Sequence, residues 1–177
     1  MATTLRARTP QLIVFLDLTR FAAQSQRVDD EVLAETIDVY YERVARAIHA
    51  AGGKAVKFIG DATLAVFPRD AVGDAVRMLL ELKPSIDRFM AERGWECRLT
   101  VKVHFGDVIA GSFGAEEQKR FDVVGRAVNA AAVLGSTGVT LSSEAFRQLP
   151  PELRRSFKKH TPPITYIRQS DPRPHGR

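Results

Sequence analysis

Residues 52–67 read GGKAVKFIGDATLAVF. Two apolar runs meet at Gly60-Asp61, and a Gly-Asp pair between such runs is a signal for the tight turn of a β-hairpin. The pattern therefore predicts a hairpin over residues 54–67. This hairpin also carries Lys57 and Asp61 inside a stretch that otherwise resembles core, and these charged side chains require an explanation.

Apolar spacing on both sides of the hairpin places it within a larger sheet. The β-branched run LIVFLDL (12–18) indicates a buried strand, and residues 28–51 show helical spacing that ends at Gly52-Gly53. The other expected elements are a helix over 71–92 that Pro84 kinks or breaks, strands over 97–105 and 107–113 flanking Gly106, a helix over 127–135, a strand over 138–142, a short helix over 143–149 and a last strand over 163–169.

This order of elements is β-α-β-β-α-β with an appended β-α-β. Two helices that cover one face of an antiparallel sheet form a ferredoxin-like α+β arrangement. The sequence predicts one domain over residues 11–169, an N-terminal tail over 1–10 and a disordered tail over 170–177.

Composition excludes several classes of protein. The 177 residues are 45% hydrophobic and 27% charged, which is typical of a globular domain. The sequence has no apolar run of about 18 residues and no secretory leader, and its single cysteine suits a reducing cytoplasm. A net charge of +5 favours anionic partners such as nucleotides, but the basic residues are scattered. We therefore expect a cytoplasmic protein that binds neither nucleic acid nor membrane.

Asp17 and Asp61 are candidate metal ligands. If the first strand and the hairpin are neighbours, a carboxylate at the end of one approaches the turn of the other. Two such carboxylates repel each other unless one is protonated or a cation lies between them. Oxygen ligands without nearby His or Cys suit Mg²⁺ or Mn²⁺. The alternative is that Asp61 only bonds its own backbone in a common turn.

Four blocks together resemble the class III nucleotide cyclases, the family of adenylate and guanylate cyclase catalytic domains. They are FLDLTRF (15–21), GGKAVKFIGDATLAVF (52–67), VHFGDVIAGSFG (103–114) and RFDVVGRAVNAAAVL (120–134). The resemblance covers about residues 11–169, and the blocks occur in the order and spacing of that family.

The resemblance implies a role for each acidic position. Asp17 and Asp61, with the backbone carbonyl of Leu18, would hold two divalent ions that serve attack of the ribose 3′-hydroxyl on the α-phosphate. The backbone amides that would bind phosphate oxygens belong to Thr19, Arg20 and Phe21.

The resemblance also implies how the base and ribose are bound. Lys57 would donate a hydrogen bond to a ring nitrogen of adenine, and Asp122 would accept one from the exocyclic amine. Asn129 would position the ribose. These three residues would act across the interface of a homodimer whose head-to-tail subunits build two composite sites.

Two positions depart from the family pattern. Val133 stands where the family has an arginine that stabilises charge on the transferring phosphate, Arg126 has the wrong helical phase to replace it, and Arg120 is one candidate substitute. In FKKHTPPITYI (157–167), Lys158 is the candidate for a lysine that reaches the triphosphate, although two prolines stiffen its approach.

The sequence allows alternatives for the base of the substrate and for the function of the chain. Lys57 and Asp122 favour ATP, whereas a chain that holds only the catalytic unit, with the ending HTPPITYI, looks similar to the pyrimidine cyclases of bacterial anti-phage signalling, which use UTP or CTP. A catalytically inactive nucleotide-binding regulatory module is the alternative function. A polymerase-like or cyclic-dinucleotide activity is disfavoured because the hairpin reads IGDAT rather than a GGDEF-type sequence.

Overall fold

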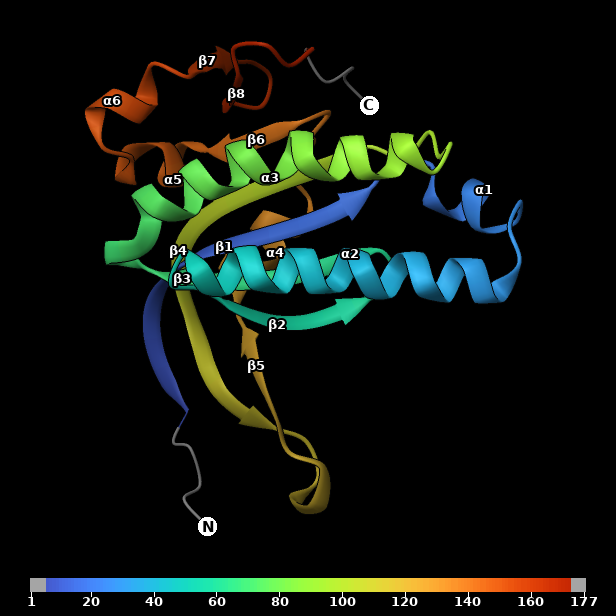
Figure 1. Cartoon of the computed structure of the whole chain (residues 1–177). Helices are drawn as coiled ribbons and strands as arrows, with labels where there is room; N and C mark the ends of the chain where they lie inside the picture. The colour runs from blue at the N-terminus through green and yellow to red at the C-terminus, as the bar shows by residue number, and fades with distance from the viewer. Residues whose placement is uncertain (1–5, 173–177) are drawn as a thin grey trace.

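The computed structural model describes residues 6–172 and shows one sheet with helices packed on it (Figure 1). The strands follow the order β2-β3-β1-β4-β6-β8-β7, and β5 pairs with β4. The strands are β1 (Ala7–Leu18), β2 (Lys54–Ile59), β3 (Ala62–Pro68), β4 (Leu99–Phe113), β5 (Arg120–Val124), β6 (Val139–Ser142), β7 (Phe157–His160) and β8 (Thr165–Arg168). The helices are α1 (Phe21–Ser25), α2 (Asp30–Ala50), α3 (Val72–Glu92), α4 (Arg126–Ala132), α5 (Ser143–Gln148) and α6 (Pro151–Arg154), with short 3₁₀ turns at Arg69–Ala71 and Glu116–Gln118.

The first six large elements confirm the α+β fold. Strand β1 lies between β3 and β4 and is antiparallel to both, and β3 is antiparallel to β2. Helices α2 and α3 make the two crossovers of this ferredoxin-like unit. The appended strand β6 joins β4 in parallel, so the complete sheet is mixed rather than purely antiparallel.

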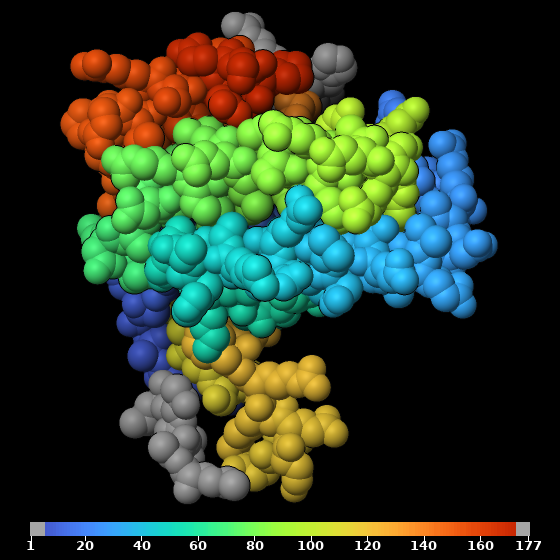
Figure 2. All heavy atoms as spheres, viewed as in Figure 1, coloured from blue at the N-terminus to red at the C-terminus, as the bar shows by residue number. Residues whose placement is uncertain are grey.

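Alternation along β1 sorts its side chains between the two faces of the sheet. Leu12, Val14 and Leu16 are buried in the main core together with Tyr40 of α2 and Leu79 of α3. Figure 2 shows these two helices lying side by side across that face. The amphipathic stripes expected over 28–51 and 71–92 are the surfaces that make this contact.

Helix α4 covers part of the opposite face. Ala127 and Ala131 pack with Ile13, Leu64 and Val108 in a second, smaller core. We call this the α4 face of the sheet. Its small alanines let the helix backbone lie close to β4.

The strand β4 continues without a break through Gly106, so the expected pair of strands flanking that glycine was wrong. A Cβ atom built at Gly106 would lie 2.8 Å from the Cβ of Ala127. The glycine therefore serves the close approach of α4, not a turn. The second half of β4 and strand β5 project away from the body of the domain (Figures 1 and 2).

Pro84 does not break helix α3, which runs from Val72 to Glu92. The proline lies on the exposed side of the helix, where a carbonyl that loses its partner can bond to water. Leu82 and Ile86, on either side of it, are buried in the main core. Burial of the apolar stripe therefore outweighs the single hydrogen bond that proline removes.

The ends of the domain also differ from the expectation. Strand β1 starts at Ala7, so part of the expected N-terminal tail is strand, and residues 1–5 lie outside the described part. Within the expected tail 170–177, Asp171 is buried and accepts a hydrogen bond from the Val139 N–H at 2.7 Å. Residues 173–177 lie outside the described part. Strands β5 and β7 were missed because both are short and charged.

None of the helices within residues 6–172 combines the length and the apolar character that crossing a bilayer requires.

Candidate active site

Asp17 and Asp61 converge on one backbone amide. Leu16 of β1 pairs with Thr63 of β3, and this register brings the turn residue Asp61 beside the end of β1. The Leu18 N–H donates to Asp17 Oδ1 at 3.1 Å and to Asp61 Oδ2 at 3.0 Å. Two carboxylates that are 44 positions apart in the sequence therefore meet at one point of the fold.

Burial and the closeness of the two carboxyls set the electrostatics of this pair. Burial, a hydrogen bond with the Asp17 carboxyl and the Asp17 charge together raise the pKa of Asp61 from 3.8 to about 6, although the Leu18 N–H opposes the shift. Sharing a proton is how two neighbouring carboxyls reduce their repulsion, and binding a cation is the other way.

The donor set fits a hard divalent cation. It offers carboxylate oxygens from Asp17 and Asp61, and within residues 6–172 no third His, Cys, Asp or Glu side chain joins them in a metal-binding cluster. Oxygen donors of this kind suit Mg²⁺ or Mn²⁺, which keep several water ligands when few protein ligands are present.

Two tyrosines of α2 hold the turn that presents Asp61. The Tyr40 hydroxyl donates to the Asp61 carbonyl at 3.1 Å, and the Tyr41 hydroxyl donates to the Gly60 carbonyl. Burial raises the pKa of Tyr40, so its hydroxyl stays a donor. The sequence analysis did not identify these residues as part of the site, because Tyr40 follows the apolar spacing of a core position.

In the loop after Asp17, one of the three backbone amides that are predicted to bind phosphate is hydrogen-bonded within the chain. The Thr19 N–H donates to the Arg98 carbonyl at 2.9 Å, and its hydroxyl accepts from the Arg98 N–H at 3.0 Å. The Thr19 amide is therefore engaged with the chain itself in this structure, and its role as a phosphate donor stays a prediction. No backbone hydrogen bond within residues 6–172 uses the Arg20 or Phe21 amide.

Arg20 has a backbone conformation that non-glycine residues rarely adopt. Its φ of 58° lies in the left-handed region, at the start of the short helix α1. Such a conformation costs on the order of 1 kcal/mol and is frequent at functional sites. The Arg20 guanidinium pairs with Glu96 at 2.7 Å on the surface.

Lys57 and Asp122 form a direct ion pair. Lys57 Nζ lies 2.6 Å from Asp122 Oδ2, and the two side chains are 41% and 27% exposed. The pair joins β2 to the projecting strand β5. Within residues 6–172 no hydrogen bond or ion pair connects it to Asp17 or Asp61.

Asn129 and Val133 lie on or next to α4. The Asn129 side chain is exposed, and Val133 follows the helix with 81% of its surface exposed. Of the two arginines considered as substitutes, Arg126 begins α4 and Arg120 lies at the outer end of β5, opposite Phe113.

The fold does not bring Lys158 to the aspartates of its own chain. Strand β7 is separated from β1 by β8, β6 and β4, about 19 Å away at the usual spacing of strands. The Lys158 ammonium donates to the Gln169 carbonyl at 2.7 Å.

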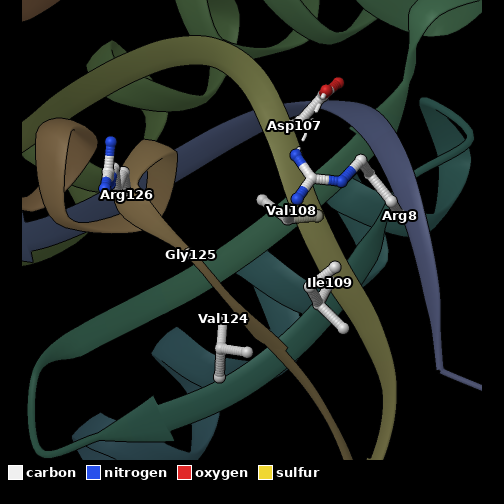
Figure 3. Close-up of a pocket in the computed structure, with 7 residues that line it drawn as sticks. All are labelled: Arg8, Asp107, Val108, Ile109, Val124, Gly125 and Arg126. Carbon is white, nitrogen blue, oxygen red and sulfur yellow. Dashed lines mark ion pairs between the residues drawn. The ribbon is translucent and has the colours of Figure 1, made fainter.

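A cavity of about 450 Å³ lies where β4 and β5 leave the body of the domain (Figure 3). Figure 3 shows the Arg8 guanidinium directed toward Asp107, at 3.8 Å, and Arg126 apart from that pair at the start of α4. None of the residues that line this cavity is a predicted site residue. The candidate site at Asp17 and Asp61 is separate from this cavity.

Comparison with known proteins places this arrangement in one family. The model of the adenylate and guanylate cyclase catalytic domain matches residues 8–160, and the chain belongs to this family, the class III nucleotide cyclases.

Its relatives include cyclases of bacteria and animals. The chain is 27% identical over 128 residues to an adenylate cyclase of Anabaena cylindrica, with 68% of this chain and 26% of that protein covered. It is 24% identical over 132 residues to mouse adenylate cyclase type 10, with 67% and 8% covered. The chain thus spans about a quarter or less of the lengths of these relatives.

Solved structures show the same fold. The guanylyl cyclase Cya2 superimposes with a TM-score of 0.82 at 20% identity, with 96% of both chains covered. The adenylyl cyclase CyaB from P. aeruginosa also gives 0.82, at 18% identity, with 97% of this chain and 100% of that chain covered.

Proposed function

We propose that this chain is a catalytic domain that converts a nucleoside triphosphate into the 3′,5′-cyclic monophosphate and pyrophosphate. The observation that carries the proposal is the convergence of Asp17 and Asp61 on the Leu18 N–H, in a chain of the cyclase family. In this reaction the ribose 3′-oxygen forms a bond to the α-phosphorus, and the bond from that phosphorus to the β-phosphate oxygen breaks. The 3′-hydroxyl proton passes to solvent, and pyrophosphate leaves.

The acidic pair is proposed to hold the metal. Asp17 and Asp61, with the Leu18 carbonyl, would hold two Mg²⁺ or Mn²⁺ ions. Such ions, when bound, lower the pKa of the 3′-hydroxyl and offset the charge of the triphosphate. The Tyr40 hydroxyl fixes the Asp61 backbone, so that the carboxylate is already in position when substrate arrives.

The remaining residues are proposed to bind and orient the substrate. The free amides of Arg20 and Phe21 would bind phosphate oxygens, and Asn129 would position the ribose. The Lys57–Asp122 pair offers one donor and one acceptor to the edge of a base. Because no contact joins this pair to the aspartates within one chain, we propose a head-to-tail homodimer with composite sites, to which Lys158 contributes from the second subunit.

Incubation with Mn²⁺ and each of ATP, GTP, CTP and UTP, followed by chromatography, tests the activity and identifies the base. ATP is the expected substrate if Lys57 and Asp122 read adenine. A preference for UTP or CTP places the chain with the pyrimidine cyclases and their role in phage defence. Formation of none of the four cyclic products contradicts the proposed activity.

The acidic pair is tested by substitution. Asp17→Ala and Asp61→Ala are each expected to abolish turnover and to leave the far-UV spectrum unchanged. Asp38→Asn, an exposed acid on α2, is the matched control and should retain full activity. Normal turnover by either site variant would remove the metal assignment.

A second candidate function is a nucleotide-binding regulatory module without catalysis. The exposed Val133, at the position where an arginine is expected, favours it. A module of this kind binds a triphosphate in the presence of Mn²⁺ and releases it unchanged. Binding without any cyclic product would select this function.

A further inference from the structure

The α4 face of the sheet carries a lysine that the proposed reaction has not yet used. Lys102 of β4 lies directly opposite Phe15 of β1, and Thr100 lies opposite Asp17. Residues opposite each other in an antiparallel pair share a face, so Lys102 and Asp17 are on the same face as diagonal neighbours. Such neighbours lie roughly 7–8 Å apart, within reach of a long side chain.

Lys102 has no acidic partner. Its ammonium donates to the Ala132 carbonyl at 3.0 Å, and no carboxylate within residues 6–172 lies within ion-pair distance of it. An ammonium has three donors, and this contact engages one of them with a neutral acceptor. By contrast, Lys57 is neutralised by Asp122. Lys102 is thus an uncompensated cation close to an acidic pair.

The end of α4 explains why a cation is needed at this point. Ala132 is the last residue of α4, and its carbonyl belongs to the negative end of the helix dipole. A triphosphate at Asp17 would meet this negative end as well as two carboxylates.

We propose that Lys102 contacts the phosphate oxygens of the triphosphate bound at Asp17 and Asp61 of the same chain, and that it stabilises the charge that develops during cyclisation. This inference rests on the proposed function. Lys102 then supplies, from the sheet, the positive charge that position 133 lacks. The Ala132 carbonyl holds the ammonium in place before the substrate binds.

The test compares Lys102→Met, which keeps the aliphatic stem, with Lys102→Arg, which keeps the charge. With the triphosphate that gives product, Lys102→Met should lower kcat about 100-fold or more, and Lys102→Arg should retain most of it. Lys159→Met, an exposed lysine on β7, is the control and should match the wild type.

A merely structural role at the end of α4 predicts a different result. Such a role would lower the Tm of Lys102→Met and leave kcat per folded molecule near that of the wild type. Inhibition by pyrophosphate separates the two: its inhibition constant should rise about tenfold in Lys102→Met, whereas inhibition by the uncharged nucleoside should not change. A kcat within about twofold of the wild type, or unchanged pyrophosphate inhibition, overturns the proposal.

Failure of the proposed function gives a distinct outcome. If the wild type makes none of the four cyclic products, the affinity for pyrophosphate in the presence of Mn²⁺ replaces turnover as the measurement. An affinity that is about tenfold weaker in Lys102→Met than in the wild type then supports the phosphate contact, and an equal affinity contradicts it.

Discussion

The Asp61 carboxyl ionises above its ordinary range because burial and Asp17 both disfavour its charged form. A raised pKa in the folded state contributes stability at low pH, and that contribution is lost as pH rises through the folded value. For Asp61 the contribution is complete below about 4 and disappears by about pH 6 to 7, since its pKa rises from 3.8 to about 6. The metal-free protein is therefore less stable at neutral pH than it would be with a neutral side chain here.

Asp61→Asn should stabilise the metal-free protein near pH 8, because asparagine can still accept from the Leu18 N–H without carrying charge. The gain is on the order of 1 kcal/mol after allowance for solvent screening, which raises Tm by about 2–4 °C. The gain should vanish near pH 4, where Asp61 is protonated. Thermal unfolding of both proteins in a chelating buffer at the two pH values measures it.

The control for this prediction is Asp38→Asn, which removes a charge from an exposed position of α2. Its effect on Tm should be small at both pH values. Addition of Mn²⁺ near pH 8 should raise the Tm of the wild type and of Asp38→Asn but not that of Asp61→Asn. Equal Mn²⁺ effects on all three proteins would contradict the assignment of Asp61 as a ligand.

Helix α4 can pack closely against β4 because Gly106 has no side chain. A Cβ there would meet the Ala127 Cβ at 2.8 Å, and Gly106→Ala should therefore destabilise the fold by about 1–3 kcal/mol. Gly135→Ala is the matched control, because nothing lies within 4 Å of a Cβ at that position. Urea unfolding of the two variants checks this, and equal midpoints would show that α4 does not press on the strand.

Elements with a long, regular pattern could be predicted from sequence, and those set by tertiary contacts could not. The hairpin over 54–67 and the pairing of Asp17 with Asp61 followed from apolar runs and a Gly-Asp turn, and the register of β1 with β3 accounts for them. Gly106 was misread because local sequence does not reveal that a helix packs on it. The engaged Thr19 amide was missed for the same reason, since Arg98 is distant in the sequence.

At the scale of the whole molecule, we propose that the site is divided between two chains. The aspartates and Lys102 lie on one face of a single chain, and Lys57, Asp122 and Asn129 are assigned to the second chain. Asp17→Ala and Asn129→Ala should each be inactive alone, because every site in either homodimer lacks one group. Mixing them should restore about a quarter of wild-type activity, since half the dimers are mixed and each has one intact site.

A second mixture of variants tests whether Lys102 acts in the site of its own chain or in the site of the other subunit. Because the lysine is assigned to the same chain as Asp17, mixing Lys102→Met with Asp17→Ala should restore no activity, since both sites of the mixed dimer lack a group from that chain. Activity measured after co-refolding of the purified variants tests both mixtures. Recovery with Lys102→Met would place the lysine in the opposite subunit's site.

The raised pKa of Asp61 gives the proposed metal binding a calorimetric signature. Below about pH 6, where Asp61 carries a proton, a divalent ion that binds its carboxylate would displace that proton into the surrounding buffer. The heat of titration with Mn²⁺ should consequently differ between two buffers of unequal ionisation enthalpy at pH 5.5 and become the same in both near pH 8. If Asp17 and Asp61 hold the metal as proposed, the acidic pair couples ion binding to the acidity of its surroundings before any nucleotide is present.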